Sequence, residues 1–348
     1  MKIPYDVRGV YVTGWTAGSS RMNDIFALID SGAINAVVID VKEDRGWITY
    51  RTDNDVAQAV GADQRRLIPD LDGLLDRLHE QNVYTIARLV SFKDPQLAEH
   101  KTEWALERKD GGIYRDAKGV SWIDAYKQPV WAYNADIAEE VAQKGFREIQ
   151  LDYVRFPENG AKVDQLVRYA EADGRPKAAV IADYIDAVRE RLKPYPVFLS
   201  ADVFGLVTSV QDDMGIGQEW GLISPRVDII SPMMYPSHYA PYTYGVDKPD
   251  LHPAAIIAGG LKDARAKDEA LVARGQRPAV IRPWYQAFSA PWLGRGNWMP
   301  YGPEEIKAQI AAGAAYGVRS YLLWDPTNRY DPAIWDVGAT SPAGAPRS

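Results

Sequence analysis

Short runs of β-forming residues alternate with longer helical patterns along the chain, and this alternation constrains the fold more than any other feature. The predicted strands are residues 8–13, 36–41, 84–92, 148–156, 197–203, 228–234, 279–284 and 320–324. The predicted helices are residues 23–31, 70–81, 134–144, 177–192 and 303–316, with a further helix inside 252–274. Eight strands connected by helices is the number that a closed (β/α)8 barrel requires. The sequence therefore predicts an α/β fold, a single-domain TIM barrel.

The main alternative is an open doubly wound sheet, which normally carries a Gly-rich phosphate-binding loop after its first strand. Here the first predicted strand runs into Val12-Thr13-Gly14-Trp15, which does not continue as G-x-G-x-x-G. We therefore assign residues 1–337 to one catalytic barrel. Residues 338–348 are small and Pro-rich, and we expect a disordered tail there.

Charge and hydropathy exclude several kinds of partner. The net charge is -7 and no dense basic run is present, so we do not expect nucleic acid as a partner. The acidic balance also argues against anionic polysaccharides, although the charge of one cleft can differ from that of the whole chain. No run of about 18 apolar residues occurs, so we expect no membrane span. The oligomeric state stays open.

Neither a cofactor nor a metal site is predicted. The chain has no Cys, and its four His show no H-x-x-x-H spacing. His238 is the only His in a strand-end loop, and we expect it to form hydrogen bonds rather than to ligate a metal. The first residues lack the apolar segment of a signal peptide. The location therefore stays open between the cell envelope, with a signal peptide outside this sequence, and the cytoplasm.

Asp152, near the carboxyl end of the fourth predicted strand, is the most informative polar residue. Strand alternation places Gln150 and Asp152 on one face, while the apolar residues between them suit the helix-facing side. Asp152 then points into the barrel, where Arg88 or Arg155 could pair with it. A salt bridge that only braces the barrel is the alternative. Because chemistry in this fold gathers at the carboxyl ends of the strands, we predict that Asp152 is catalytic.

A barrel mouth with several carboxylates and many aromatic residues suits glycoside hydrolysis, which needs two carboxyl groups flanking the bond. The second carboxylate is assigned by elimination, because strands six and seven end without one. Asp202 on the fifth strand is the first candidate, followed by Asp325 on the eighth and Glu43 on the second. Capping or salt-bridging for Asp202, and an Asx-turn for Asp325, stay open as alternatives.

Other polar and aromatic residues at strand ends are predicted to bind substrate. Arginine can hold a carboxylate ionised or bind sugar hydroxyls, and indole or phenol rings can stack on the C–H faces of pyranose rings. The alternatives are structural ion pairs and packing at the barrel rim. The predicted substrate-binding residues are Trp15, Asp40, Glu43, Arg88, Gln150, Arg155, Tyr235, His238, Arg282, Trp284 and Trp324.

Several segments of the chain resemble a bacterial family of glycoside hydrolases that was long catalogued as a domain of unknown function. The segments are 38–42 (VIDVK), 86–88 (IAR), 148–157 (EIQLDYVRFP), 200–205 (SADVFG), 231–239 (SPMMYPSHY), 281–284 (IRPW) and 323–324 (LW). They occur in the same order from about Val7 to Tyr330, so the resemblance covers nearly the whole chain.

The resemblance implies a barrel glycosidase related to the α-amylases and α-galactosidases, in which an Asp ending the fourth strand is the nucleophile of a retaining mechanism. Asp152 matches that position. The α-amylase type carries its acid on the fifth strand, which points to Asp202. That type uses Glu there and a third carboxylate on the seventh strand, where this chain has Arg282-Pro283-Trp284.

The first functional hypothesis is therefore a retaining glycoside hydrolase or transglycosylase that acts on an oligo- or polysaccharide. A non-catalytic carbohydrate-binding or cell-wall-associated barrel is the second. A barrel esterase or deacetylase is weaker, because the chain lacks G-x-S-x-G. We expect residues 93–128 and 289–302 to shape the subsites.

Overall fold

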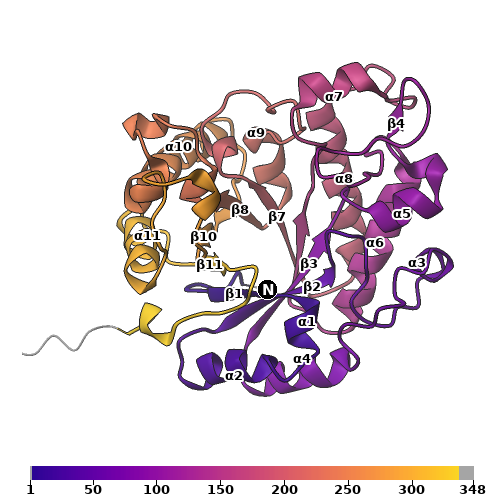
Figure 1. The fold of residues 1–348 in the computed structure, drawn as a ribbon. Helices are drawn as coiled ribbons and strands as arrows, with labels where there is room; N and C mark the ends of the chain where they lie inside the picture. Colours follow the sequence, from indigo (N-terminus) through magenta and orange to yellow (C-terminus); the bar gives the residue numbers. More distant parts are fainter. Residues whose placement is uncertain (1, 337–348) are drawn as a thin grey trace, which may run out of the picture.

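Eight parallel strands close into a barrel in the computed structural model, which describes residues 2–336. Residues 338–348, predicted as a tail, lie outside this range. The strands, in barrel order, are β1 (Arg8–Val12), β2 (Ala36–Lys42), β3 (Tyr84–Val90), β5 (Glu148–Asp152), β7 (Phe198–Phe204), β8 (Ile229–Met234), β9 (Val280–Ile281) with β10 (Trp284–Gln286), and β11 (Tyr321–Trp324). β8 pairs with both β7 and β10, and β11 pairs with β1, which closes the ring. The predicted TIM barrel is confirmed (Figure 1).

The seventh barrel strand is divided into β9 and β10 by Arg282 and Pro283. Pro283 has no N–H to donate to a neighbouring strand, so the ladder is interrupted there. The Arg282 N–H still donates to the Ile230 carbonyl (3.0 Å), and the Pro283 carbonyl accepts from the Leu322 N–H (2.9 Å). The two halves therefore act as one strand of the barrel.

The fourth barrel strand ends earlier than the sequence predicts. It was expected to run to Phe156, but β5 stops at Asp152. The reason is local, because Tyr153 has a φ of 46°, in the left-handed region that side chains other than glycine rarely adopt. The chain therefore turns sharply away from the sheet directly after Asp152.

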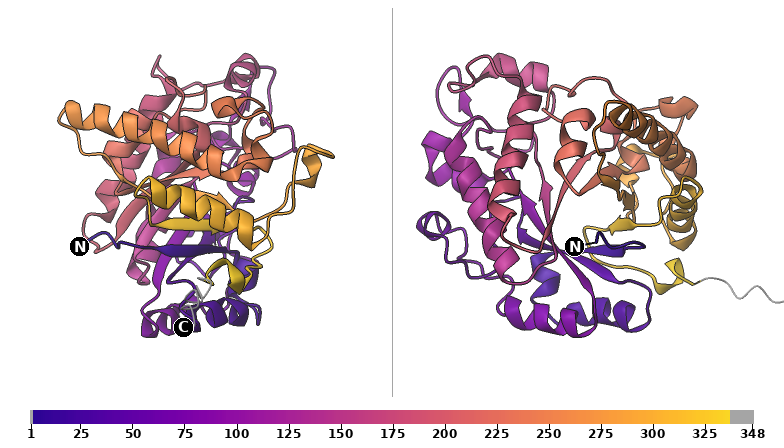
Figure 2. Two further views of the ribbon diagram at one scale, coloured as in Figure 1. Left: turned by 90° about the vertical axis from the view of Figure 1, so that its left-hand side faces the viewer. Right: turned by 180° about the vertical axis from the view of Figure 1, so that it is seen from behind.

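A ring of helices covers the outside of the barrel. The long ones are α2 (Met22–Asp30), α4 (Leu71–Glu80), α6 (Gln128–Gln143), α8 (Lys177–Leu192), α10 (Pro253–Ala273) and α11 (Pro303–Ala315). Figure 2 shows α10 and α11 side by side across one flank. α4 follows Asp70, the first residue of the predicted helix, whose side chain caps α4 by accepting from the Gly73 N–H (2.9 Å). α6 begins at Gln128 rather than at the predicted Asn134, with Pro129 in its first turn, where a missing N–H costs nothing.

The segment 93–128, which we expected to shape the subsites, contains short elements of its own. They are α5 (Pro95–His100) and β4 (Glu107–Arg108), and β4 pairs antiparallel with β6 (Val167–Arg168). β6 follows α7 (Gly160–Leu166) in the loop after β5. The remaining short helices are α1 (Gly14–Ala17), α3 (Asp55–Ala59) and α9 (Trp220–Ile223). The loops after β3 and β5 are thus joined into one structure at the barrel mouth.

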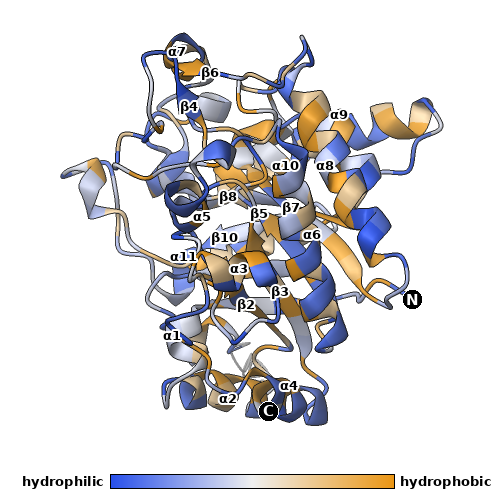
Figure 3. Ribbon diagram, turned by 90° about the vertical axis from the view of Figure 1, so that its right-hand side faces the viewer, coloured by the Kyte–Doolittle hydropathy of each residue, from blue (hydrophilic) through white to orange (hydrophobic). Residues whose placement is uncertain are grey.

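Strand alternation divides the core as predicted. Ile149 and Leu151 are buried in the large hydrophobic cluster that joins the sheet to the helices. Gln150 and Asp152 point the other way, into the barrel, where Asp152 meets Arg88. Figure 3 shows that the helices around the barrel carry both hydrophobic and hydrophilic stretches. The barrel interior therefore holds a polar layer inside an apolar shell.

Candidate active site

A cavity of 420 Å³ opens at the carboxyl ends of the barrel strands. This is the end of the barrel at which TIM-barrel enzymes carry their chemistry. Its lining residues are Arg88, Lys118, Asp152, Tyr153, Arg155, Glu158, Asp202, Phe204, Gly205, Leu206, Met214, Met233, Tyr235, His238, Tyr239, Trp284 and Trp324. We call it the main cavity.

Asp152 is held at the floor of the main cavity by two hydrogen bonds and an ion pair. Its Oδ2 accepts from Arg88 Nε (2.8 Å) and lies 2.7 Å from Arg88 Nη2 in a salt bridge. Its Oδ1 accepts from the Tyr153 N–H (2.7 Å), which the left-handed turn aims back at the side chain. The carboxylate is therefore oriented from two sides, with both Arg88 contacts on Oδ2.

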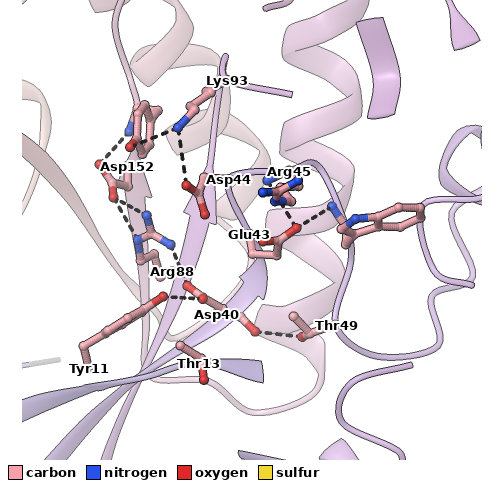
Figure 4. Close-up of polar contacts among 12 residues, drawn as sticks. Tyr11, Thr13, Asp40, Glu43, Asp44, Arg45, Thr49, Arg88, Lys93 and Asp152 are labelled. Atoms are coloured by element: carbon pink, nitrogen blue, oxygen red, sulfur yellow. Dashed lines mark hydrogen bonds and ion pairs between the residues drawn. The ribbon is translucent and has the colours of Figure 1, made fainter. Parts of the chain in front are cut away.

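Arg88 links Asp152 to a second buried carboxylate. Arg88 Nη1 donates to Asp40 Oδ1 (2.6 Å), and the Tyr11 hydroxyl donates to Asp40 Oδ2 (2.6 Å), as Figure 4 shows. Burial alone would lower the pKa of Arg88, but Asp152 and Asp40 outweigh it and raise that pKa well above its usual value. Arg88 is therefore a fixed positive charge beneath Asp152.

Asp202, on β7, lies in a different environment. Its Oδ1 accepts from the Trp284 indole N–H (2.8 Å), while its buried Oδ2 has no hydrogen-bond partner among the residues that the structure describes. Burial, and then the negative charge of Asp152, raise the pKa of Asp202 well above its usual value, although the Trp284 hydrogen bond lowers it. Asp202 is therefore the carboxyl group in this cavity that favours the protonated form.

The strand register makes these two acids neighbours. β5 and β7 pair in parallel with Leu151 opposite Ala201, so the next residue on each strand is Asp152 and Asp202. Neighbouring strands lie about 4.8 Å apart and in-register side chains point to the same face. An acid that carries a proton therefore stands beside a carboxylate held in a salt bridge.

Aromatic rings form much of the wall. The Trp324 ring stacks on Tyr11 with ring centroids 3.8 Å apart, and it meets Trp284 edge to face at 5.4 Å. The buried Tyr235 hydroxyl has no hydrogen-bond partner. Rings held in place by one another offer a rigid apolar face with polar edges, which suits the C–H face and hydroxyl groups of a sugar.

The main cavity brings together eight of the residues predicted for the site. Asp152, Asp202, Arg88, Arg155, Tyr235, His238, Trp284 and Trp324 all line it. His238 lies at the rim, where its Nδ1 is 2.9 Å from the Ser237 hydroxyl. Desolvation lowers the pKa of its imidazole, which favours the neutral ring at pH 7.

Asp325 does not line the main cavity. Its oxygens accept from the Thr327 N–H (2.9 Å), the Thr327 hydroxyl (2.8 Å) and the Arg329 N–H (2.9 Å). These bonds close the loop after β11, which is the Asx-type alternative that the sequence left open. We therefore leave Asp325 out of the proposed catalytic pair.

Arg282 is also placed away from the main cavity, at the opposite end of the barrel interior. It forms an ion pair with Glu148, the first residue of β5, and both side chains are buried. Glu148 also accepts from the hydroxyls of Tyr84 (2.8 Å) and Ser200 (2.6 Å). The predicted substrate-binding arginine is therefore part of a structural ion pair, because it lies four residues before the carboxyl end of the seventh barrel strand at Gln286.

Four further candidates lie outside the lining. Asp40 and Gln150 are buried beneath Arg88 and Asp152, and neither amide atom of Gln150 has a partner. Glu43 points away from Asp152 and accepts from the N–H groups of its own loop, while burial raises its pKa to about 7 (Figure 4). Trp15, on α1, is 64% exposed. Substrate contacts by these residues stay predictions.

Sequence reasoning missed several residues of the site. Tyr11 follows Gly9 on the inward face of β1, so strand alternation could have identified it. Tyr153, Glu158 and Tyr239 lie within or beside segments that were singled out, but their own positions were not used. Lys118 comes from the long segment 93–128, where no sequence pattern indicates which residue reaches the cavity.

No group of three or more His, Cys, Asp or Glu side chains within residues 2–336 is arranged to hold a metal ion. Across the same residues, no helix has the length and apolar character needed to cross a membrane.

Comparisons with solved structures agree with the fold. A hypothetical protein from Ruminiclostridium thermocellum is 34% identical, over 60% of this chain and 98% of that chain, with a TM-score of 0.51. The PgaB glycoside hydrolase domain from Bordetella bronchiseptica has a TM-score of 0.62 at 12% identity, covering 92% of this chain and 94% of that chain. A β-galactosidase from Marinomonas ef1 has a TM-score of 0.64 at 11% identity, covering 94% of this chain and 58% of that chain. The last two likenesses concern the fold alone.

No curated protein matches the chain. A family model does match, over residues 9–330, which include every barrel strand except the first residue of β1. The chain therefore belongs to the family described as "Putative glycosyl hydrolase domain".

Proposed function

We propose that this protein hydrolyses glycosidic bonds with retention of configuration, with Asp152 as the nucleophile and Asp202 as the acid and base. The observation that carries the proposal is the contrast between these neighbouring carboxyl groups. Asp152 is held in a salt bridge with Arg88, whereas Asp202 has one bare oxygen in a buried site. A retaining glycosidase needs one carboxylate and one carboxylic acid on the two sides of the bond.

In the first step, Asp152 Oδ1 forms a bond to the anomeric carbon. The bond from that carbon to the leaving oxygen breaks, and the leaving oxygen takes the proton of Asp202. We assign Oδ1 as the attacking atom because Oδ2 faces Arg88, which donates to it from Nε and pairs with it through Nη2. The bonds from Arg88 and from the Tyr153 N–H hold the carboxylate in one orientation.

In the second step, Asp202 takes a proton from water while the water oxygen bonds to the anomeric carbon. The ester bond to Asp152 breaks and releases the carboxylate. The electrostatics favour this change of role, because the charge of Asp152 is one of the causes that raise the pKa of Asp202. Once Asp152 is esterified that charge is gone, the pKa of Asp202 falls, and Asp202 becomes a base.

The strand geometry supports retention over inversion. Asp152 and Asp202 directly follow the paired residues Leu151 and Ala201, on strands whose backbones lie about 4.8 Å apart. Retaining enzymes place their carboxyl groups roughly 5 to 5.5 Å apart, whereas inverting enzymes need about 6.5 to 9.5 Å. Side chains that leave adjacent strands on the same face therefore favour the shorter, retaining separation.

The test is a screen of a panel of polysaccharides and aryl glycosides with the wild-type protein, Asp152→Asn and Asp76→Asn. Asp76 lies on the exposed face of α4 and is the matched control. We expect turnover by the wild type and the control, a product of retained configuration by NMR, and a loss of at least about 10³-fold for Asp152→Asn. Full activity of Asp152→Asn on a glycan that the wild type hydrolyses would disprove the assignment. Specific binding by all three proteins without turnover would instead favour the carbohydrate-binding barrel.

A further inference from the structure

A second cavity of 320 Å³ adjoins the main cavity. Its walls come from the segment 93–128 and from the loop after β5, which are joined through the β4–β6 pair. Lys118, Tyr153, Arg155 and Glu158 line both cavities. A glycan bound at Asp152 would therefore pass one of its neighbouring sugars into the second cavity.

The second cavity is rich in cationic side chains, although the whole chain has a net charge of -7. Its lining holds five cationic side chains and two carboxylates. Lys93 and Arg115 form ion pairs with carboxylates outside the lining. Lys118 and Lys162 form no ion pair with any of residues 2–336. Two lysine charges thus face this space without a counterion.

The lining carboxylates do not compensate these lysines. Asp116 accepts from the N–H groups of Lys118 (2.9 Å) and Val120 (3.0 Å) and from the Trp122 indole (3.0 Å), so its oxygens are used by its own loop. Glu158 pairs with Arg155 at 3.1 Å. Neither carboxylate forms an ion pair with Lys118 or Lys162 within the part of the chain that the structure describes.

Arg155 is a buried cation with weak compensation. Its side chain is 4% exposed, while that of Glu158, its carboxylate partner, is 64% exposed. Burial lowers the pKa of Arg155, in contrast to Arg88, whose pKa two buried carboxylates raise. A buried charge without a buried partner is costly, and a bound anion would offset that cost.

The same guanidinium is fixed in place by aromatic rings. It lies 5.1 Å from the Trp122 ring centroid and 5.0 Å from that of Tyr153, and these two rings meet edge to face at 5.9 Å. A rigid guanidinium beside apolar rings can bind a carboxylate or sulfate group while the rings contact the body of the sugar.

We propose that the second cavity is a subsite for an acidic sugar, so that the substrate is a glycan that carries a carboxylate or sulfate group next to the bond that is cleaved. This inference rests on the proposed function, because it assigns the sugar beside the one that Asp152 attacks. It replaces the expectation, drawn from net charge, that anionic polysaccharides are poor substrates. The charge of the local cavity is opposite to that of the chain.

The test compares acidic oligosaccharides with their carboxyl-reduced or desulfated forms, which keep the backbone and the linkage. Affinity is measured by calorimetry with Asp152→Asn, and turnover with the wild type. We expect the acidic form to bind about tenfold more tightly than its neutral form. We also expect the preference to weaken as salt rises, because Lys118 and Lys162 are exposed.

Substitutions of Lys118 and Lys162 test whether these two residues cause the preference for the acidic form. Lys118→Glu combined with Lys162→Glu should remove the preference for the acidic form, measured as the ratio of its affinity to that of the neutral form. Lys2→Glu combined with Lys262→Glu changes the net charge equally at exposed positions outside both cavities, and should have no effect. Lys118→Gln with Lys162→Gln should give an intermediate preference, and thermal denaturation checks that each variant is folded.

The outcomes separate this inference from the proposed function. Equal binding of acidic and neutral forms, or an equal loss in the Lys2/Lys262 variant, would overturn the subsite while the wild type still hydrolyses glycans. Tight, Lys118-dependent binding of acidic glycans without turnover would support the subsite and overturn the hydrolase. Binding of neither form would overturn the subsite.

Discussion

The two ends of the barrel interior use the same kinds of side chain in opposite ways. At the amino end, the buried Glu148 accepts from Tyr84, Ser200 and Arg282. At the carboxyl end, Asp202 accepts only from Trp284 among residues 2–336 and leaves its other oxygen without a partner there. A carboxylate with all its hydrogen bonds made stabilises the fold, whereas an unpartnered buried oxygen is costly unless a substrate or a proton occupies it. The carboxyl end is therefore the one that we propose to carry the chemistry.

Among the substitutions that follow, Asp202→Asn is expected to have the largest effect on turnover. Asp202→Asn should lower kcat by about 10² to 10⁴-fold, because general acid catalysis supplies an acceleration of that size. The loss should be smaller for aryl glycosides whose leaving group needs no proton. The same variant should unfold at an equal or higher temperature, since it removes a buried acid whose second oxygen has no partner. A lower melting temperature together with unchanged kcat would reverse the roles assigned to the two ends.

Replacing Glu148 should show the opposite pattern, with a large loss of stability and little change in kcat. Glu148→Gln leaves Arg282 buried without its counterion and should lower the free energy of unfolding by about 3 kcal/mol. Chemical denaturation measures this loss. The folded fraction should keep a kcat within about threefold of the wild type, because Glu148 does not line the main cavity. A large loss of kcat in fully folded protein would contradict the division between the two ends.

Stability should depend on pH through Asp202. Its folded-state pKa is raised, so the proton that it holds stabilises the native state fully at a pH below the unfolded pKa of about 3.9. That contribution is lost as the pH rises towards and through the folded pKa. The melting temperature of the wild type should therefore fall more steeply above about pH 4 than that of Asp202→Asn. Parallel melting curves for the two proteins would show that Asp202 is not protonated in the native state.

Trp284 should influence the pKa of Asp202. Its N–H bond favours the charged form of Asp202, so Trp284→Phe should raise the pKa of Asp202 further. Because the first step needs protonated Asp202, the alkaline limb of kcat/KM should move to higher pH. Trp324→Phe, which changes a neighbouring ring of the same cavity without touching Asp202, is the control for the pH profile. If the alkaline limb of kcat/KM does not move in Trp284→Phe, the group that titrates there is not Asp202.

The smallest effect should come from replacing Trp324, whose ring stacks on Tyr11 in the wall of the main cavity. Trp324→Ala removes the ring that packs on Tyr11 and should raise KM by roughly tenfold, in line with about 1.5 kcal/mol for an aromatic contact. The change in kcat should be smaller than the change in KM. Steady-state kinetics on one oligosaccharide separate the two. A pure loss of kcat would show that Trp324 acts on the position of Arg88 rather than on the sugar.

The sequence correctly predicted the direction of the Asp152 side chain but not the end of the strand that carries it. Alternation along β5 correctly placed Gln150 and Asp152 inside the barrel, because the two-residue period of a strand is a local property of the backbone. It also predicted a strand up to Phe156, and missed the left-handed turn at Tyr153. That turn follows no residue preference, since Tyr does not favour positive φ.

The local sequence pattern could not predict which charged side chains would form ion pairs with one another. Either Arg88 or Arg155 could have paired with Asp152, and the structure brings in Arg88, while Arg155 pairs with Glu158. Arg282 stood near Trp284 in the sequence, yet its side chain crosses the interior to Glu148. Arg88 and Asp152, like Arg282 and Glu148, come from strands far apart in the chain, and their meeting depends on the stagger of the closed barrel.

By itself, the sequence determined the barrel, the eight strands and the inward direction of Asp152, because hydrophobic periodicity is a local property of each segment. Only the tertiary structure decided that Trp284, 82 residues away, would bind one oxygen of Asp202 and leave the other bare. It also decided that a chain of net charge -7 would gather lysines and a buried arginine beside the main cavity. The physical reason is that burial and hydrogen bonding depend on which side chains closure of the barrel and docking of its loops bring together.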